Sequence, residues 1–276
     1  MVIVIQCADR TGLVSAITAV LAANKLNIVS LREYVDQTEN RFYMRLEVTE
    51  QFDAVLLETE FQQVLPAGAL ISINPSPNKK IVLLVTKEYH CLTDILVKNY
   101  FNSLGATVAA VIGNYPTLQD ICRRFDIPFF LVSHENKEHA TFESEITEVI
   151  QQYEPDYIVL AKFMRILSPD FVAGLPMRII NIHHSFLPAF IGANPYRKAF
   201  ERGVKLIGAT AHFVTNDLDE GPIITQQTIP VNHSQVTADM VKAGKEIETS
   251  VLAKALRLVF DDRVFVYRNK TVVFDW

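Results

Sequence analysis

The chain of 276 residues contains no continuous apolar run that approaches the roughly 18 residues of a membrane-spanning helix. Its N-terminal stretch, MVIVIQCADR, lacks a basic segment and a long apolar segment, so it predicts a strand and not a signal peptide. The three cysteines, Cys7, Cys91 and Cys122, have the spacing of no metal site, which indicates a reducing compartment. We therefore expect a cytoplasmic protein without a membrane partner.

Basic residues are not in excess either. The chain has 26 Lys and Arg against 31 Asp and Glu, a formal net charge of -5. Because a phosphate backbone selects clustered Lys and Arg, a nucleic acid partner is not expected. A small anionic substrate needs only a few local charges and is compatible with this composition.

The length suggests about two domains at roughly 150 residues each. The clearest boundary is INPSPNKK, residues 73–80, where Pro75 and Pro77 block both a helix and a strand ladder. We predict a first domain over residues 1–74, a linker over 75–80 and a second domain over 81–276.

The first domain shows an order of strand, helix, two strands, helix and strand. This βαββαβ order predicts a ferredoxin-like antiparallel sheet with both helices on one face. The expected elements are strand 2–6, a helix from Leu13, strands 27–37 and 41–50, helix 52–65 and strand 68–74.

The second domain alternates apolar strands with helical patterns, which predicts an open, mostly parallel α/β sheet. The expected strands are 81–86, 106–113, 128–132, 157–161 and 178–182, and the expected helices are 92–103, 117–125, 139–153 and 236–260, before a hairpin at 264–274. In such sheets, ligands bind beyond the carboxyl ends of the strands.

The stretch NIHHSFLP, residues 181–188, lies at one of these strand ends. Alternate residues of a strand share a face, so Asn181 and His183 point the same way and His184 points oppositely if the strand continues that far. An amide beside an imidazole offers hydrogen bonds to a carbonyl oxygen and a group that holds a proton near neutral pH. The alternative is a buried polar pair that closes the loop.

A second polar segment, IGATAHFVTNDLDEGPIIT, covers residues 207–225. It predicts two strands around an acidic turn that contains Asp217, Asp219 and Glu220. On its own, such a turn is more often a solvated hairpin than a site.

Together with LAKFMRILSPDFV, residues 160–172, these two segments resemble the folate-dependent formyltransferase family. That family carries an Asn-x-His-x-Ser-x-x-Pro strand end and a His…Asp-x-Gly turn, and the resemblance covers most of residues 80–230. It implies that Asn181 binds the formyl oxygen, that His183 stabilises the oxyanion or transfers a proton, and that Asp219 binds His183 or a water. His212 would support the site and His184 would be structural.

The same resemblance implies a folate pocket. Its residues would be Met164, Arg165, Ile166, Leu167 and Val172, with packing at a helix entry as the alternative, above all for Val172.

The formyl acceptor is a separate question. Transferases that act on a phosphorylated amine carry a glycine-rich loop after their first strand, whereas VTKEYHCLTDIL, residues 85–96, has no glycine, and Glu88 would repel a phosphate. The segment looks like the members of the family that pass the formyl group to water, although Thr86 stands where they usually have Ser. The expected reaction is hydrolysis of 10-formyltetrahydrofolate to formate and tetrahydrofolate, which serves purine synthesis and folate balance, with no metal and no further cofactor. An amine formyltransferase and a non-catalytic folate or amino-acid sensor are the alternatives.

The first domain resembles an ACT domain through QCADRTGLVSAITAVLAANKLNIVSL. This resemblance implies a homo-oligomer, a dimer or tetramer, and an amino-acid effector near the first loop; the alternative is an ordinary turn in a domain that only dimerises. The expected effector-binding residues are Asp9, Arg10, Gly12, Leu13, Asn27 and Ile28.

Overall fold

The computed structural model describes residues 1–74, 78–189 and 195–275. Contacts within the chain divide it into two compact units, which are described one at a time. Residues 75–77 of the predicted linker lie outside the described residues, and its last two residues, Lys79 and Lys80, begin a strand of the second unit.

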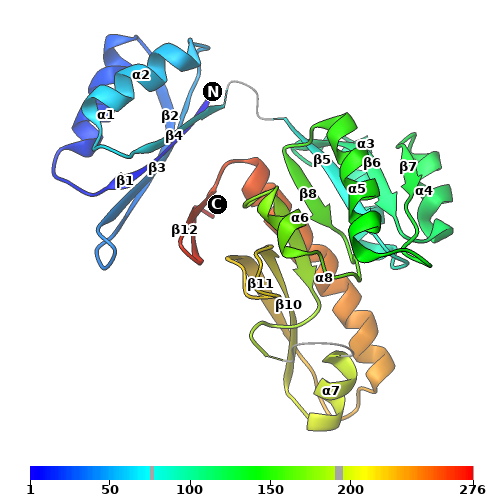
Figure 1. The fold of residues 1–276 in the computed structure, drawn as a ribbon. Helices are drawn as coiled ribbons and strands as arrows, with labels where there is room; N and C mark the ends of the chain where they lie inside the picture. The colour runs from blue at the N-terminus through cyan, green and yellow to red at the C-terminus, as the bar shows by residue number, and fades with distance from the viewer. Residues whose placement is uncertain (75–77, 190–194, 276) are drawn as a thin grey trace. The chain divides into compact units, whose positions relative to one another are not determined.

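The first unit is an antiparallel sheet covered by two helices (Figure 1). Its strands pair in the order β2-β3-β1-β4, which confirms the predicted βαββαβ fold. The elements are β1 (Val2–Ala8), α1 (Leu13–Ala23), β2 (Ile28–Asp36), β3 (Arg41–Val48), α2 (Ala54–Val64) and β4 (Leu70–Asn74).

Apolar side chains at helical spacing hold this unit together. Leu13, Ile17 and Leu21 of α1 and Leu57 and Phe61 of α2 are buried in one cluster with the sheet. Each such side chain contributes on the order of 2 kcal/mol when it leaves water. The helices are therefore fixed by packing on one face of the sheet.

The C-terminal hairpin, β12 (Val264–Tyr267) and β13 (Lys270–Val273), differs from the predicted assignment. The predicted second domain covered all of 81–276, but residues 258–267 and 272–275 group with the first unit. The reason is packing on β3: the Tyr43 and Phe265 rings lie 5.4 Å apart at their centroids, and Arg45 Nε donates to the Asp261 carbonyl at 2.9 Å.

The second unit contains a seven-stranded sheet in the order β11-β10-β9-β8-β5-β6-β7. The five strands β5 to β9 are parallel, and β10 and β11 are antiparallel, so the predicted open, mostly parallel sheet is confirmed. Its strands are β5 (Lys79–Val85), β6 (Ala106–Gly113), β7 (Phe129–Leu131), β8 (Tyr157–Leu160), β9 (Ile179–His183), β10 (Leu206–Phe213) and β11 (Ile223–Pro230).

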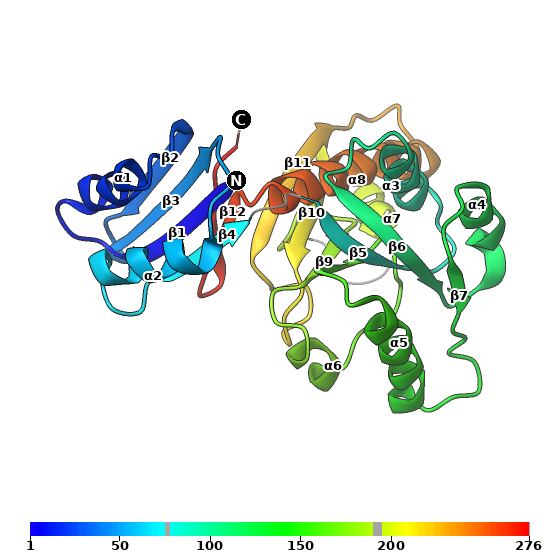
Figure 2. The same cartoon turned by 90° about the horizontal axis from the view of Figure 1, so that it is seen from above.

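Helices cover both faces of this sheet, with α3 and α8 on one side and α5 and α6 on the other (Figure 2). On the α5 face, Phe142 and Ile146 pack against Val82 and Leu84 of β5. The helices are α3 (His90–Tyr100), the 3-10 turn η1 (Pro116–Leu118), α4 (Gln119–Arg124), α5 (His139–Tyr153), α6 (Pro169–Ala173), α7 (Pro195–Arg202) and α8 (Thr237–Phe260). Among the described helices, none has the length and apolar character needed to cross a bilayer.

The strand order fixes where a ligand can bind. From β5, the middle one of the five parallel strands, the chain moves to β6 and β7 on one side and then to β8 and β9 on the other. Such a reversal opens a crevice at the carboxyl ends of the strands.

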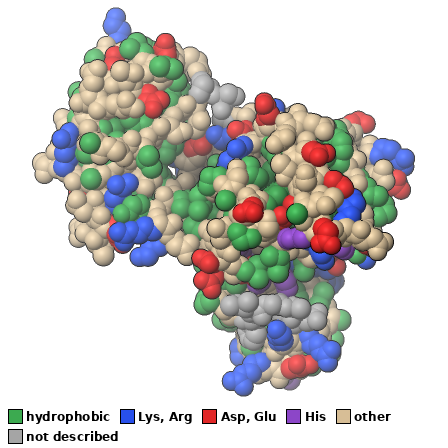
Figure 3. All heavy atoms as spheres, viewed as in Figure 1, with side chains coloured by type: hydrophobic (Ala, Val, Ile, Leu, Met, Phe, Trp, Pro, Cys, Tyr) green, Lys and Arg blue, Asp and Glu red, His purple; other side chains and the backbone are tan. Residues whose placement is uncertain are grey.

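Acidic and basic side chains are interspersed over the face in Figure 3, with no broad field of one sign.

Candidate active site

Asn181 and His183 are held side by side on β9, at the carboxyl edge of the sheet. Antiparallel pairing with β10 places His212 directly opposite Asn181 and Thr210 opposite His183. Directly opposed residues of neighbouring strands lie close enough for their side chains to interact. The edge therefore brings an amide and two imidazoles together.

His212 fixes the orientation of the Asn181 amide. Burial lowers the pKa of His212, so its ring is neutral, and its Nδ1 donates to the Phe213 carbonyl at 2.9 Å. In a neutral imidazole with a proton on Nδ1, Nε2 must accept. Asn181 Nδ2 donates to that Nε2 at 3.2 Å. One N–H of the amide is thereby occupied, and its second N–H stays available to a ligand.

Asp219 lies at the turn after β10 and contacts His183. Its Oδ1 is 3.2 Å from His183 Nδ1 and 3.9 Å from His212 Nε2. The hydrogen bond from His183 lowers the pKa of Asp219, which keeps it ionised. His183 Nε2 is buried and has no hydrogen-bond partner among the described residues. The carboxylate thus fixes one ring nitrogen and leaves the other available.

These side chains line a cavity of about 330 Å³. The cavity wall also includes Met164, Arg165, Ile166 and Leu167, four of the five predicted folate residues. Val172 is instead buried in the core, 5% exposed, beside α5 and β8. Its packing role, which the sequence analysis left open, is the one that the structure displays.

Four hydrogen bonds anchor the loop of residues 164–168. Thr86 at the end of β5 accepts from the Met164 amide at 2.9 Å. Glu143 of α5, which is buried, accepts from the Ser168 amide at 2.6 Å and from its hydroxyl group. His139 Nε2 lies 3.1 Å from the Ile166 carbonyl. These contacts fix the cavity wall from two directions.

Comparison with known proteins identifies the family. The sequence model of formyl transferases matches residues 79–256, and that of ACT domains matches residues 1–66. A formyltetrahydrofolate deformylase of Escherichia coli is 50% identical over 267 residues, which cover 97% of this chain and 95% of that protein. Its Haemophilus influenzae counterpart is 49% identical over 272 residues, 99% of this chain and 98% of that one.

The crystal structure of a formyltetrahydrofolate deformylase from Pseudomonas syringae is similar with a TM-score of 0.93 and 37% identity, over 99% of this chain and 94% of that one. The chain belongs to the formyltetrahydrofolate deformylase family. The match confirms the predicted fold class, an ACT domain followed by a formyltransferase domain.

In this member of the deformylase family, the predicted orientation of His184 depended on the strand continuing through residue 184. The strand ends at His183, so the alternation that would turn His184 away does not continue. Its ring lies 5.1 Å from that of His183 and lines the same cavity. Burial, and after it the charge of Lys162, lower the pKa of His184 to about 4, so its imidazole is a neutral part of the wall.

A buried charge network that was not predicted from the sequence is centred on Glu248 of α8 and includes the cavity-lining residue Lys162. Glu248 Oε2 is 2.8 Å from His90 Nε2 and 3.0 Å from Lys162 Nζ, and its Oε1 accepts from the Tyr196 hydroxyl at 2.6 Å. Burial alone would raise the pKa of Glu248, but the hydrogen bond from His90 and the charge of Lys162 outweigh it and bring the value to about 2. The carboxylate is therefore ionised and fully paired.

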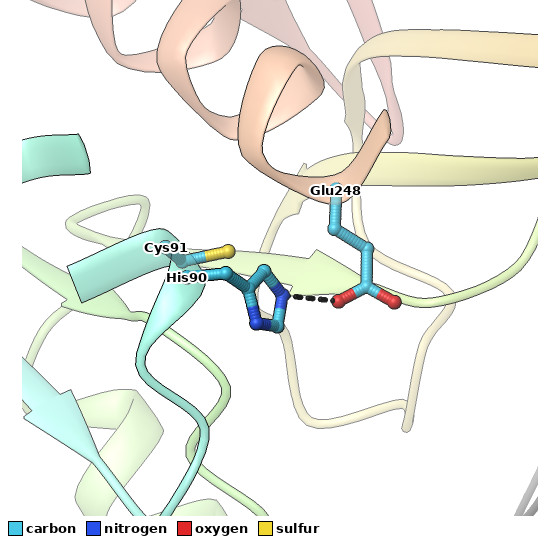
Figure 4. Close-up of side chains that lie close together, drawn as sticks. All are labelled: His90, Cys91 and Glu248. Atoms are coloured by element: carbon cyan, nitrogen blue, oxygen red, sulfur yellow. Dashed lines mark hydrogen bonds and ion pairs between the residues drawn. The ribbon is translucent and has the colours of Figure 1, made fainter. Parts of the chain in front are cut away.

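His90, Cys91 and Glu248 also have the proximity of a metal site, with their ligand atoms within 4.8 Å of one another (Figure 4). Two observations oppose a bound divalent cation there. The ammonium of Lys162 already neutralises the carboxylate. Burial raises the pKa of the Cys91 thiol, so it is not the thiolate that metals require. We interpret the cluster as an ion-pair network.

The predicted effector residues of the ACT domain surround the loop after β1. Gly12 precedes α1 as its N-cap with φ 89°, a conformation that glycine adopts without strain, and a Cβ there would meet no atom within 4 Å. Arg10 donates to the Val64 carbonyl at 2.6 Å. Asp9 forms a backbone hydrogen bond to Asn40, at 3.0 Å.

The other three predicted effector residues are placed as follows. Leu13 is buried in the core, 2% exposed, which leaves it a packing residue. Asn27 is exposed, and its backbone N–H donates to the Glu50 carboxylate at 2.9 Å. Ile28 is the first residue of β2.

Proposed function

We propose that the protein hydrolyses 10-formyltetrahydrofolate to formate and tetrahydrofolate. Membership in the deformylase family supports the reaction, and one geometric observation supports the site. His183 has one nitrogen bound to Asp219 and the other unpartnered in a cavity, beside an oriented amide. This is the arrangement that a general base and an oxyanion donor require.

The proposed reaction begins when water attacks the formyl carbon. His183 Nε2 takes a proton from that water, and Asp219 stabilises the imidazolium that forms. The formyl oxygen becomes an oxyanion that accepts from the second N–H of Asn181, a donor worth on the order of 3 kcal/mol. The bond between the formyl carbon and N10 then breaks, the proton passes to N10, and formate and tetrahydrofolate leave. The folate is the substrate, and no cofactor is needed.

Water is favoured over a phosphorylated amine acceptor by the segment after β5. Residues 85–96 contain no glycine, and helix α3 begins at His90 without a side-chain cap. Lys245 of α8, a cation that reaches this segment, is paired with Glu88 at 2.7 Å. A phosphorylated amine would meet a carboxylate here instead of a cradle of amides.

We further propose that residues 164–167 bind the folate and that the ACT domain binds an amino-acid effector near Gly12. The protein is proposed to act in the cytoplasm as a homo-oligomer, where it supplies formate for purine synthesis and balances one-carbon folate pools.

The test is formate release from 10-formyltetrahydrofolate by the purified full chain and by His183→Ala. Steady turnover that falls at least about 100-fold in the variant supports the reaction and its base. A folded protein that binds tetrahydrofolate but releases no formate contradicts the proposal.

A further inference from the structure

We propose that Lys162 is a further catalytic residue and that Glu248 positions it. In this role, the Lys162 ammonium donates a hydrogen bond to the formyl oxygen as negative charge develops there. The inference rests on the proposed hydrolysis and adds a charged donor to the amide of Asn181.

Lys162 lies close to the proposed catalytic residues in the fold. It follows β8 at the carboxyl edge of the sheet and lines the same cavity as Asn181, His183 and Asp219. Its backbone has φ 64°, a left-handed conformation that is unfavourable for a residue with a side chain. Asp219, with φ 58°, has the same conformation in the same cavity. Strained residues of this kind cluster at functional sites.

The Lys162 ammonium has more hydrogen-bond donors than the described residues use. A lysine ammonium has three N–H groups. Glu248 accepts one at 3.0 Å, and no other described residue accepts from Nζ. The residue is only 7% exposed, so bulk water has little access to the remaining donors. A partly satisfied, buried ammonium on a residue that lines a cavity is suited to an anionic ligand.

Glu248 explains why the ammonium stays in place. Its carboxylate is held by His90 from α3 and by Tyr196 from α7, so two helices and the end of β8 each bring a partner to this side chain of α8. With both oxygens held, Glu248 cannot follow Lys162 if the lysine shifts. The ammonium is therefore preorganised, which is the condition for effective electrostatic stabilisation of a transition state.

The proposed hydrolysis develops negative charge that a cation at the cavity would stabilise. Water attack converts a neutral formamide into a tetrahedral oxyanion, and cleavage of the bond to N10 leaves formate, which is also an anion. Neutral His184 and His212 add no positive charge nearby. Lys162 stabilises the negative charge in the intermediate and does not exchange a proton.

The experiment compares Lys162→Met with the double variant Lys162→Met/Glu248→Gln. The single variant leaves Glu248 buried without its ion-pair partner, and the double variant removes both charges, a replacement that folds often tolerate. We expect both to lose about 100-fold or more in kcat, the cost of one oxyanion donor, with unchanged affinity for tetrahydrofolate. Lys98→Met removes a lysine paired with Asp94 on α3, outside the cavity, and should retain wild-type kcat.

The outcomes separate the two hypotheses. If the double variant recovers wild-type kcat, Lys162 only neutralises Glu248, and its catalytic role is contradicted. If kcat falls in parallel with tetrahydrofolate affinity, the loss is one of pocket structure, which also contradicts it. A wild-type protein without formate release contradicts the proposed function itself, and with it the role of Lys162.

Discussion

Replacement of Asp219 by asparagine tests the tautomer of His183. In the native site, the carboxylate accepts from Nδ1 across 3.2 Å, so Nε2 of the neutral ring has the lone pair that removes a proton from water. Asparagine has the same shape but can present its N–H to Nδ1. The ring proton then moves to Nε2, where it blocks proton removal.

The size of the effect follows from the contact. The Asp219 side chain is 13% exposed, so solvent screens the interaction little. Loss of a hydrogen bond to a charged group costs about 1.5–3 kcal/mol, which corresponds to roughly 10- to 150-fold in rate. The wrong tautomer adds to this loss, and the comparable substitution in serine proteases lowers kcat about 10⁴-fold. We expect a decrease in kcat between about 10²-fold and 10⁴-fold.

The assay is steady-state formate release, with tetrahydrofolate affinity measured on the same preparation. Asp217→Asn is the matched control, because Asp217 lies in the same turn and is exposed. It should leave kcat unchanged. A kcat of Asp219→Asn within about threefold of wild type, with intact tetrahydrofolate binding, would refute the assigned roles of His183 and Asp219.

Two further predictions concern the cavity wall. Glu143→Ala removes the acceptor of Ser168, so the loop of residues 164–168 loosens. We expect KM for 10-formyltetrahydrofolate to rise about tenfold with kcat nearly constant. The control is Glu148→Ala, an exposed position on the same helix, which should change neither constant. A rise in KM equal in both variants would exclude the anchoring role. Because the pKa of His184 falls from 6.5 unfolded to about 4 folded, its contribution to stability is complete above pH 6.5 and is lost as the pH falls toward 4. At about 1.4 kcal/mol per pH unit, this loss amounts to about 3 kcal/mol, and urea unfolding of His184→Gln should show a correspondingly smaller loss of stability between pH 7 and pH 4. Equal acid sensitivity of both proteins would contradict a neutral, buried His184.

The elements with strong periodicity could be predicted from the sequence. Strand 106–113 and helix 139–153 were predicted with the bounds that the structure has. The short helices α6 and α7 were not predicted, because five and eight residues are too few to display helical periodicity. The grouping of β12 with the first unit depends on contacts such as Tyr43 with Phe265, which no local pattern reveals.

Some contacts of the site could be predicted from local sequence patterns, and others could not. Asn181 and His183 stand two residues apart on one strand, so their proximity follows from strand geometry alone. The orientation predicted for His184 depended on the strand continuing through it, and the strand ends one residue earlier, at His183. Glu248 and His90 are 158 positions apart, and their contact arises only when α3 and α8 pack on the same face of the sheet. Lys162 lies within the segment of residues 160–172, but nothing in the sequence indicated that Glu248 is its ion-pair partner.

The most direct test of the account is the source of the oxygen in the product. The purified full chain would turn over 10-formyltetrahydrofolate in water enriched in oxygen-18, without any added amine, and formate would be analysed by mass spectrometry. We predict one formate per tetrahydrofolate, with one oxygen atom from the solvent. Consumption of the substrate only when an amine is added, with the formyl group recovered on that amine, would contradict hydrolysis.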